Sequence, residues 1–440
     1  MIVSRLPPVK LAFGNGQFGA DKLRGLLAYG PYRALRETAP RFGFVFPTES
    51  RNHANKLFLA LKNGIGLFRG VENTFRFSLS TEQVFSIPVS GVQQSSSADH
   101  ESNARAYAEA ILAWHNKQQK DRPDLFFVLH PKTADFERAT PYYRAKALLL
   151  KDGILSQNVT LDLLDNSSQF EWSAANIALA AFVKLGGIPW VVGGEELDHD
   201  LVIGLGRAFL FDYQTRRTAG YLAFTACFSA RGPLRFISLA RPALSEKDYL
   251  DTLLSVVTTT LKRADQQNSE ASSLTVHAPK EMGRDEMGVI HGAVRSHQKT
   301  NVLQVLLAKV TEELSFFAID DRFRDGVPQR GTAIQITDRD FMLYTEGRDE
   351  KQSWSSRLPV ALRITPQGEP LAAQNALHVL RQINDLSQVN WRGFNARSKP
   401  ISVYYGNLIA RLLSHVAPTS VADLYQQNAL SMLEERLWFL

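Results

Sequence analysis

One cysteine, Cys227, is present in the 440 residues. A chain with a single cysteine cannot build an internal disulfide framework, and it cannot bind zinc through cysteines alone. Small secreted domains depend on several disulfides, so this composition excludes that class. We expect Cys227 to be an ordinary strand residue in a reducing compartment.

Long apolar runs are also absent. The N-terminal residues, MIVSRLPPVKLAFGNG, lack the apolar core of about 7–15 residues that a secretory signal needs. The best candidate for a membrane span, 174–194, is interrupted by Lys184, Gly186, Gly187 and Pro189. We therefore expect a cytoplasmic protein without a transmembrane helix and without a membrane partner.

A large excess of one charge sign is missing as well. Lys and Arg total 50, Asp and Glu total 44, and the formal net charge is +6. This mild basic bias permits a polyanionic partner without establishing one. Hydrophobic residues make up 44% and aromatic residues 10%, which is typical of globular rather than disordered chains. At about 100–200 residues per domain, the length predicts two or three domains.

The sequence motifs of several common enzyme classes do not occur. There is no P-loop, no G-x-S-x-G nucleophile elbow, no H-E-x-x-H and no EF-hand loop. Gly204 and Gly206 lack the third glycine of a dinucleotide site, so we interpret them as a tight strand end. GGEELDHD, at 193–200, could hold a metal but is more typical of a solvated turn. His277, near a strand end, is more typical of a packed or surface residue than of a base.

The first half of the chain alternates helix and strand signals. Its helices show an apolar period near 3.6 residues, and its strands are short continuous apolar runs, as in buried parallel sheets. Pro141 opens one helix, and Ser173 is the expected N-cap of another. We expect a polar loop at 90–103, helices at about 104–118, 141–151 and 173–185, and strands at 125–129 and 189–192. This alternation predicts an α/β fold with a parallel sheet.

The second half begins with consecutive strands and continues with strand–helix units. This pattern predicts a mixed sheet that is covered by helices. The expected strands are 201–206, 220–230, 234–240, 274–278, 302–310, 316–319, 332–337, 341–345 and 401–405. The expected helices are about 245–264, 280–297, 372–387 and 406–416.

Basic and polar residues of the first half could converge on one phosphate. Tyr142 and Lys146 share a helix face, Asn176 and Lys184 lie on the next helix, and Gln157 stands between the two helices. Ammonium groups supply charge and Tyr and Gln supply directional hydrogen bonds, which suits a terminal phosphate. A simpler alternative, which spacing alone favours, is that Lys184 complements the helix dipole and Lys146 is solvated.

A second basic segment, NWRGFNARSKP at 390–400, alternates cations with aromatic residues. Its cations, Arg392, Arg397 and Lys399, could contact successive phosphates while its aromatic residues stack or pack. An equally good interpretation is a core tryptophan, Trp391, that is surrounded by exposed charges.

Several stretches resemble a known family. TPYYRAK, SQ and NIALAAFVKLGGIPW resemble the MID domain of Argonaute proteins. VNWRGFNARSKPISVYYGNLIARL and the final LWFL resemble the end of their PIWI domain, and GLLAYGPYR resembles the entry segment of short prokaryotic Argonautes. The resemblance implies a Rossmann-like MID domain and an RNase H-like PIWI domain with a mixed sheet. It divides the chain into a segment at 1–30 that packs on PIWI, MID at 31–192 and PIWI at 193–440.

In this family the MID domain grips the 5′ phosphate of a guide strand. The resemblance implies that Tyr142, Lys146, Gln157 and Lys184 form this pocket. It places Asn176 near the second and third guide phosphates.

The resemblance also implies a metal ion and a backbone-binding segment. The C-terminal carboxylate of Leu440, with Gln157, would hold Mg²⁺ against the guide phosphates, which is chemistry that a hard, oxygen-ligated cation can perform. Arg392, Arg397 and Lys399 would hold the backbone of the guide seed.

Slicing Argonautes hold two metals with a tetrad of acidic residues, in which a histidine can take the last place. At three of these positions the sequence has Gly206, Ala278 and Asn407. We therefore expect a catalytically inactive PIWI domain and no guide-directed cleavage. The alternative is a nuclease that uses other carboxylates, such as Asp198 or Asp200.

The resemblance finally implies partners and a role in prokaryotic immunity. We expect a 5′-phosphorylated guide RNA, a complementary single-stranded target DNA, and a heterodimer with an APAZ-containing effector. A sirtuin-like or TIR effector that destroys NAD is preferred over a nuclease. Its activation would serve plasmid and antiviral defence by abortive infection. A guide-independent single-strand binder is the remaining alternative.

Overall fold

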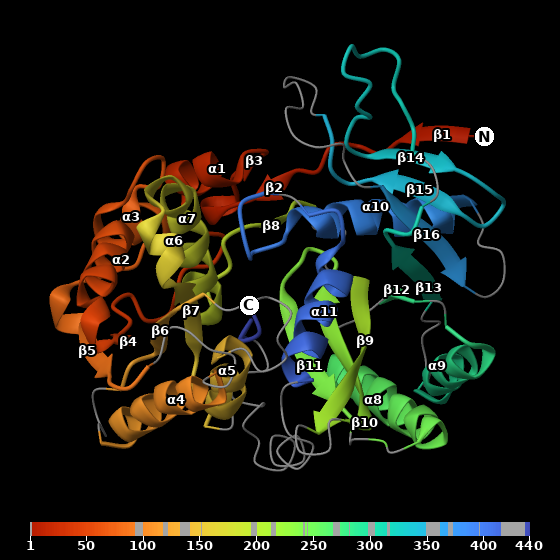
Figure 1. The fold of residues 1–440 in the computed structure, drawn as a ribbon. Coiled ribbons are helices and arrows are strands. Elements are labelled where there is room, and N and C mark those ends of the chain that lie inside the picture. The colour runs from red at the N-terminus through yellow and green to blue at the C-terminus, as the bar shows by residue number, and fades with distance from the viewer. Residues whose placement is uncertain are drawn as a thin grey trace.

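The computed structural model describes most of the chain. The described residues are 2–92, 100–117, 122–132, 141–150, 152–194, 200–212, 217–240, 243, 245–266, 273–280, 282–297, 304–314, 317–348, 361–367, 373–395, 397–414 and 436–440. They form two main sheets with helices on both faces of each, a mixed α/β architecture (Figure 1).

The first main sheet has four parallel strands in the order β5-β4-β6-β7. β4 (Phe42–Pro47) and β6 (Leu125–His130) are central and buried at every position. Such continuous apolar runs require cover on both faces of a sheet. β5 (Val84–Val89) and β7 (Ser156–Thr160) are the outer strands. The predicted α/β fold with a parallel sheet is confirmed.

Helices cover both faces of this sheet. α4 and α5 share one apolar cluster with it, and α2 and α7 share another. α7 is buried over most of its length because alanines and apolar residues surround nearly its whole circumference. The bounds are α2 (Arg51–Asn63), α3 (Gly70–Phe75), α4 (His100–Lys117), α5 (Pro141–Leu150), α6 (Leu161–Asp165) and α7 (Ser167–Lys184).

The second main sheet has nine strands in the order β1-β14-β15-β16-β13-β12-β9-β10-β11. β9, β12 and β13 run parallel, and the other pairs in this sheet are antiparallel. The mixed sheet is therefore confirmed. Its strands are β1 (Ile2–Arg5), β9 (Asp200–Asp212), β10 (Arg217–Ser229), β11 (Leu234–Leu239), β12 (Ser273–Ala278), β13 (Gln304–Thr311), β14 (Thr332–Gln335), β15 (Phe341–Tyr344) and β16 (Leu362–Gln367).

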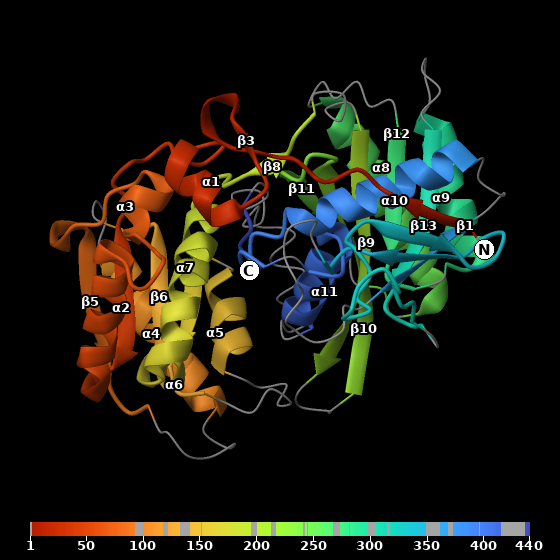
Figure 2. The ribbon, with the colours of Figure 1, turned by 90° about the horizontal axis from the view of Figure 1, so that it is seen from above.

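Four helices cover this sheet from two sides (Figure 2). α8 (Glu246–Gln266) and α9 (Arg284–His297) share an apolar cluster with β9, β10 and β12. α10 (Ala373–Gln388) and α11 (Ile401–Leu413) join the clusters of the opposite face. Within the described ranges, no helix has the length and apolarity that crossing a bilayer requires.

The N-terminal segment connects the two sheets. β1 pairs with β14 at the edge of the nine-stranded sheet. β2 (Leu11–Ala12) lies between β3 (Phe18–Gly19) and β8 (Val191–Val192), which follows α7. α1 (Lys22–Tyr29) follows and is capped by Asp21, whose side chain accepts a hydrogen bond from the Arg24 amide.

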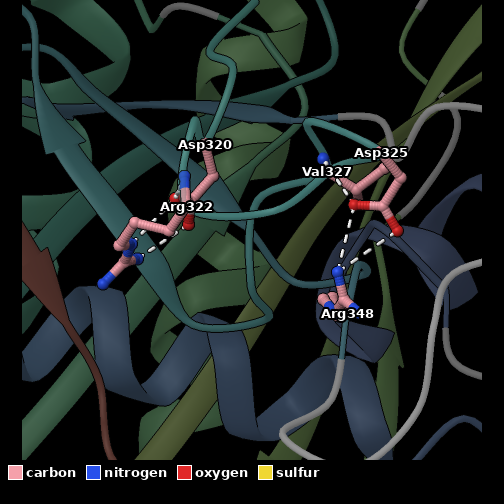
Figure 3. A network of polar contacts seen from close by, with 5 residues as sticks. All are labelled: Asp320, Arg322, Asp325, Val327 and Arg348. Atoms are coloured by element: carbon pink, nitrogen blue, oxygen red, sulfur yellow. Dashed lines mark hydrogen bonds and ion pairs between the residues drawn. The ribbon is translucent and has the colours of Figure 1, made fainter.

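Two ion pairs hold the long connection that leads from β13 to β14 (Figure 3). Both guanidinium nitrogens Nε and Nη2 of Arg322 donate to Asp320, at 2.8 and 2.7 Å. Asp325 accepts from Arg348 at 3.2 Å and from the Val327 amide at 3.2 Å. The second pair joins this connection to Arg348, which follows β15.

Two predicted strands are wrong. Residues 401–405 begin α11 instead of forming a strand. β-branched and aromatic residues favour strands, but here Ile401, Val403 and Tyr405 are all buried in one helix that lies against β9. Tertiary packing overrides local propensity in such a case. Residues 317–319 of the predicted strand 316–319 form no strand, and residue 316 lies outside the described residues.

Two predicted boundaries are wrong as well. α7 begins near Asn166, whose side chain accepts from the Gln169 amide at 3.1 Å, so Ser173 lies inside the helix rather than at its N-cap. Gly204 and Gly206 lie within β9 rather than at its end. They serve close packing instead of a turn, because a Cβ at Gly204 would lie 2.1 Å from the Ser402 carbonyl oxygen in α11.

Candidate functional site: a buried lysine pair between the sheets

Four elements bring polar groups together where the first sheet meets the end of the chain. Lys146 lies on α5, Gln157 on β7, and Lys184 in the last turn of α7. Leu440 is the fourth contributor, and its side chain belongs to the same apolar cluster as β6, α7 and α11. Figure 1 shows the C-terminus between the two sheets.

Both lysines are buried and directed at oxygen atoms. Lys184 is fully buried, and its Nζ donates to the Ser156 carbonyl at 2.8 Å and to Gln157 Oε1 at 2.6 Å. Lys146 is 2% exposed, and its Nζ donates to the main-chain oxygen of Leu440 at 2.7 Å. Lys146 is therefore not a solvated lysine, so that part of the simpler alternative is wrong. Lys184 lies in the last turn of α7, where it can complement the helix dipole, but its ammonium group also binds β7.

Burial and nearby positive charges disfavour the charged forms of these lysines. Burial, with a further contribution from the Arg392 guanidinium, lowers the pKa of Lys146 to about 7. Burial, followed by Lys146 and Arg392, holds the pKa of Lys184 well below its usual value. A buried cation is stabilised by an opposite charge nearby. The pocket formed by Lys146, Gln157, Lys184 and Leu440, hereafter the lysine pocket, therefore favours a compact anion as its ligand.

The segment at 390–400 is anchored through its tryptophan. Trp391 is 3% exposed, and its Nε1 donates to the Trp190 carbonyl at 3.1 Å. Trp190 Nε1 in turn donates to the Gln388 carbonyl at 3.2 Å. The core-tryptophan interpretation is thus correct for Trp391. It does not exclude a binding role for the neighbouring cations, because these are outside the core.

Asn176 connects α7 to this segment. Its Oδ1 accepts from the Phe394 amide at 3.1 Å, and its Nδ2 donates to the Trp172 carbonyl at 3.4 Å. A Cβ at Gly393 would lie 3.1 Å from Asn176 Oδ1, so a glycine permits this close approach. Asn176 therefore holds the segment against α7, one function of this residue that spacing did not indicate.

The three cations of the segment separate into two groups. Arg392 and Arg397 are exposed, and both meet Tyr404: Arg392 Nη1 donates to its hydroxyl at 2.9 Å, and the Arg397 guanidinium lies 5.7 Å from its ring centroid. Lys399 instead forms an ion pair with Glu312 at 2.9 Å. Tyr404 was missed by sequence reasoning, since its only signal was its position within a presumed strand.

Tyr142 lies on α5, one turn before Lys146, but its side chain is outside the described residues. The acidic run at 193–200 is also largely outside them, Asp198 and His199 included. Asp200 is described, and its carboxylate lies 3.6 Å from His378 Nε2.

The three positions at which the resemblance places the metal-binding residues of the family lie in packed parts of the nine-stranded sheet or on α11. A Cβ at Gly206, in β9, would lie 2.0 Å from Cζ of Phe224. Ala278 ends β12 and is 1% exposed, and Asn407 lies on α11. Beside them, His277 is fully buried, and its Nδ1 is 2.7 Å from Ser402 Oγ. Burial lowers the pKa of His277 to about 3, so it is a neutral packed residue, as expected.

Comparison with known proteins relates this chain to one family. The family model described as "Piwi domain" matches residues 132–417, which is more than half of the chain. A protein argonaute from Cereibacter sphaeroides is 23% identical over 445 residues, an alignment that covers 95% of this chain and 56% of the relative. The chain therefore spans about half the length of this relative.

Solved structures share the fold. Clostridium butyricum Argonaute, bound to a guide DNA with a 5′ deoxycytidine and to a 19-mer target DNA, has a TM-score of 0.68 at 17% identity and covers 95% of this chain and 53% of its own. Drosophila Piwi has a TM-score of 0.69 at 15% identity, with 100% of this chain and 56% of its own covered. At these identities the likeness concerns the fold, which is that of MID and RNase H-like PIWI domains.

Proposed function

The chain belongs to the Argonaute/Piwi family, and from this membership and the lysine pocket we propose that it binds the 5′-phosphorylated end of a guide strand. The observation that carries the proposal is the convergence of two buried lysines of lowered pKa on the oxygens of Ser156, Gln157 and Leu440, because a phosphate dianion there would add negative charge that stabilises both ammonium groups. In this proposal MID covers 31–192 and PIWI covers 193–440.

The residues of the pocket have distinct roles in the proposal. Lys146 and Lys184 donate charge-assisted hydrogen bonds to the phosphate, and Tyr142 and Gln157 add directional ones. Asn176, Arg392 and Arg397 follow along the backbone, with Arg392 positioned by Tyr404. Lys399 would contribute only if its ion pair with Glu312 opened.

Mg²⁺ fits this pocket only together with a phosphate. The two oxygens expected to bind it, Gln157 Oε1 and a Leu440 main-chain oxygen, both accept hydrogen bonds from lysines in this structure. Mg²⁺ commonly binds through one or two protein oxygens and completes its shell with phosphate oxygens and water. Gln157 and Leu440 would hold the ion, which would neutralise phosphate charge.

We further propose that the guide directs recognition without cleavage. Placing an acid at Gly206 requires Phe224 to move, and Ala278 and Asn407 supply no carboxylate. The resemblance to short prokaryotic Argonautes supports an RNA guide, a single-stranded DNA target and an APAZ effector in defence against plasmids and viruses. Co-purification with the product of a neighbouring gene would test the effector.

The first test compares RNAs that differ only in a 5′ phosphate or a 5′ hydroxyl. We expect the phosphorylated RNA to bind about 100-fold or more tightly, because two charge-assisted hydrogen bonds contribute about 1.5–3 kcal/mol each. Chelation of Mg²⁺ should reduce this preference. Equal affinity with a steep salt dependence would instead establish a general single-strand binder. Cleavage of a paired target at one fixed position, with Mn²⁺ present, would contradict catalytic inactivity.

The affinity for the 5′ phosphate should fall as pH rises above about 7. The free pocket releases a proton from Lys146 near pH 7, and the lowered pKa of Lys184 acts in the same direction, whereas the phosphate complex requires the charged forms. Binding therefore takes up protons, and each proton costs up to about tenfold in affinity per pH unit. Calorimetry in buffers of different ionisation enthalpy should detect this uptake. A 5′-hydroxyl RNA is the control and should show no such proton uptake at this pocket.

A further inference from the structure

Trp172 on α7 is the most exposed large hydrophobic side chain among the described residues, with 72% of its surface accessible. Its neighbours Glu171 and Gln169 are exposed and polar, and Ser173 is half-buried. A single indole in polar surroundings is too small for a protein-docking patch, which needs a contiguous apolar area of several hundred Å². It has the form of a stacking platform for one planar group.

The position of Trp172 relates it to the lysine pocket. Its carbonyl accepts from Asn176 Nδ2, and Asn176 also holds the Phe394 amide. Beyond Asn176, α7 is buried as far as Lys184. Trp172 is thus on the last open turn of α7 before the 390–400 segment covers the helix. A residue and the residue four positions later share a helix face, so Trp172 is on the side of Asn176.

The separation of Trp172 and Lys184 along α7 matches the length of several nucleotides of a bound strand. At a rise of about 1.5 Å per residue, Trp172 and Lys184 are separated by about 18 Å along the helix axis. A nucleic-acid strand advances about 3.4 Å per nucleotide, so this separation corresponds to about five nucleotides. A strand whose 5′ phosphate is in the lysine pocket, or the strand paired with it, can therefore reach the indole.

We propose that Trp172 stacks on a nucleobase of the nucleic acid whose 5′ phosphate occupies the lysine pocket, an inference that rests on the proposed function. Every base presents a π face, so this contact would add affinity without reading sequence. The base can belong to the guide or to the target, since the chemistry is the same for both.

The test places 2-aminopurine at single positions of a 5′-phosphorylated guide RNA, and separately of the complementary target DNA. We expect its fluorescence to be quenched at one or two adjacent positions in wild-type complexes and to recover in Trp172→Ala. Recovery with the labelled guide or with the labelled target shows which of the two strands contacts Trp172. Affinity should fall about 5- to 100-fold in Trp172→Ala, and Trp172→Phe should retain most of it.

The matched control is Leu67→Ala. Leu67 is 66% exposed, and the adjacent Gly66 closely approaches Glu171, so it lies near the same end of α7 but has no aromatic ring. Unchanged fluorescence and affinity in Trp172→Ala would overturn the proposal, and so would equal losses in Leu67→Ala. If the 5′-phosphate preference is absent in wild type, the proposed function fails, while the fluorescence still reports on Trp172. If the preference persists and the fluorescence does not change, only the stacking proposal fails.

Discussion

Lys146→Met combined with Lys184→Met is expected to abolish the preference for a 5′-phosphorylated RNA. Each lysine contributes a charge-assisted hydrogen bond of about 1.5–3 kcal/mol, so losing both corresponds to about 10²- to 10⁴-fold in affinity. Methionine fills a similar volume without a charge. Because the buried oxygens of Ser156, Gln157 and Leu440 would lose their donors, the variant should also unfold at a lower temperature than wild type when no guide is present. Filter binding and thermal unfolding measure the two effects.

Lys22→Met is the matched control for this variant. Lys22 is also buried, its pKa is lowered to about 7 by burial and by Arg330, and its Nζ lies 5.6 Å from the centroid of Trp190. It is not part of the lysine pocket, so its replacement should leave the 5′-phosphate preference intact. A similar loss in both variants would mean that a general change in fold, rather than the pocket, determines affinity.

Gly204→Ala is expected to destabilise the nine-stranded sheet strongly. The new Cβ would lie 2.1 Å from the Ser402 carbonyl oxygen, and both atoms belong to backbone regions that cannot rotate away. α11 would have to shift from β9, and the contact of His277 with Ser402 would be disturbed. Overpacking of this kind costs about 1–3 kcal/mol or more in free energy of unfolding. Denaturant unfolding would measure it.

Gly406→Ala, in the same helix, is expected to raise the free energy of unfolding instead of lowering it. Gly406 lies in α11, and no heavy atom is within 4 Å of the position that its Cβ would take. Alanine is favoured over glycine inside a helix by about 0.5–1 kcal/mol, so we expect a small stabilisation. If both variants behaved alike, the close approach of β9 and α11 would not be the reason for the glycine at 204.

The elements that could be predicted are those whose signal is local. β6 is a continuous apolar run, and α4 has a clear apolar period, so both were found within a few residues. The strand predicted at 401–405 is wrong. Its β-branched and aromatic side chains favour a strand, but burial in two apolar clusters stabilises a helix there. No local signal distinguishes these cases.

For the candidate site, too, local features could be predicted and contacts between distant segments could not. The types and spacing of Lys146, Gln157 and Lys184 were enough to group them, and the resemblance added Leu440. Their burial could not be predicted, because it depends on the end of the chain closing over α5 and β7. The ion pair of Lys399 with Glu312 and the contacts of Tyr404 also join distant segments, and a single sequence carries no signal for such pairs.

The contact between Lys146 and Leu440 joins residues 294 positions apart. Those between Trp190 and Trp391 and between Asn176 and Phe394 span 201 and 218 positions. Loops of this size close slowly, and non-local contacts form late in folding. A growing polypeptide on the ribosome therefore has the parallel sheet well before it has the pocket. A polypeptide that stops before residues 437–440 would contain the parallel sheet and both lysines, but it would lack the contact of Lys146 with Leu440 that completes the lysine pocket.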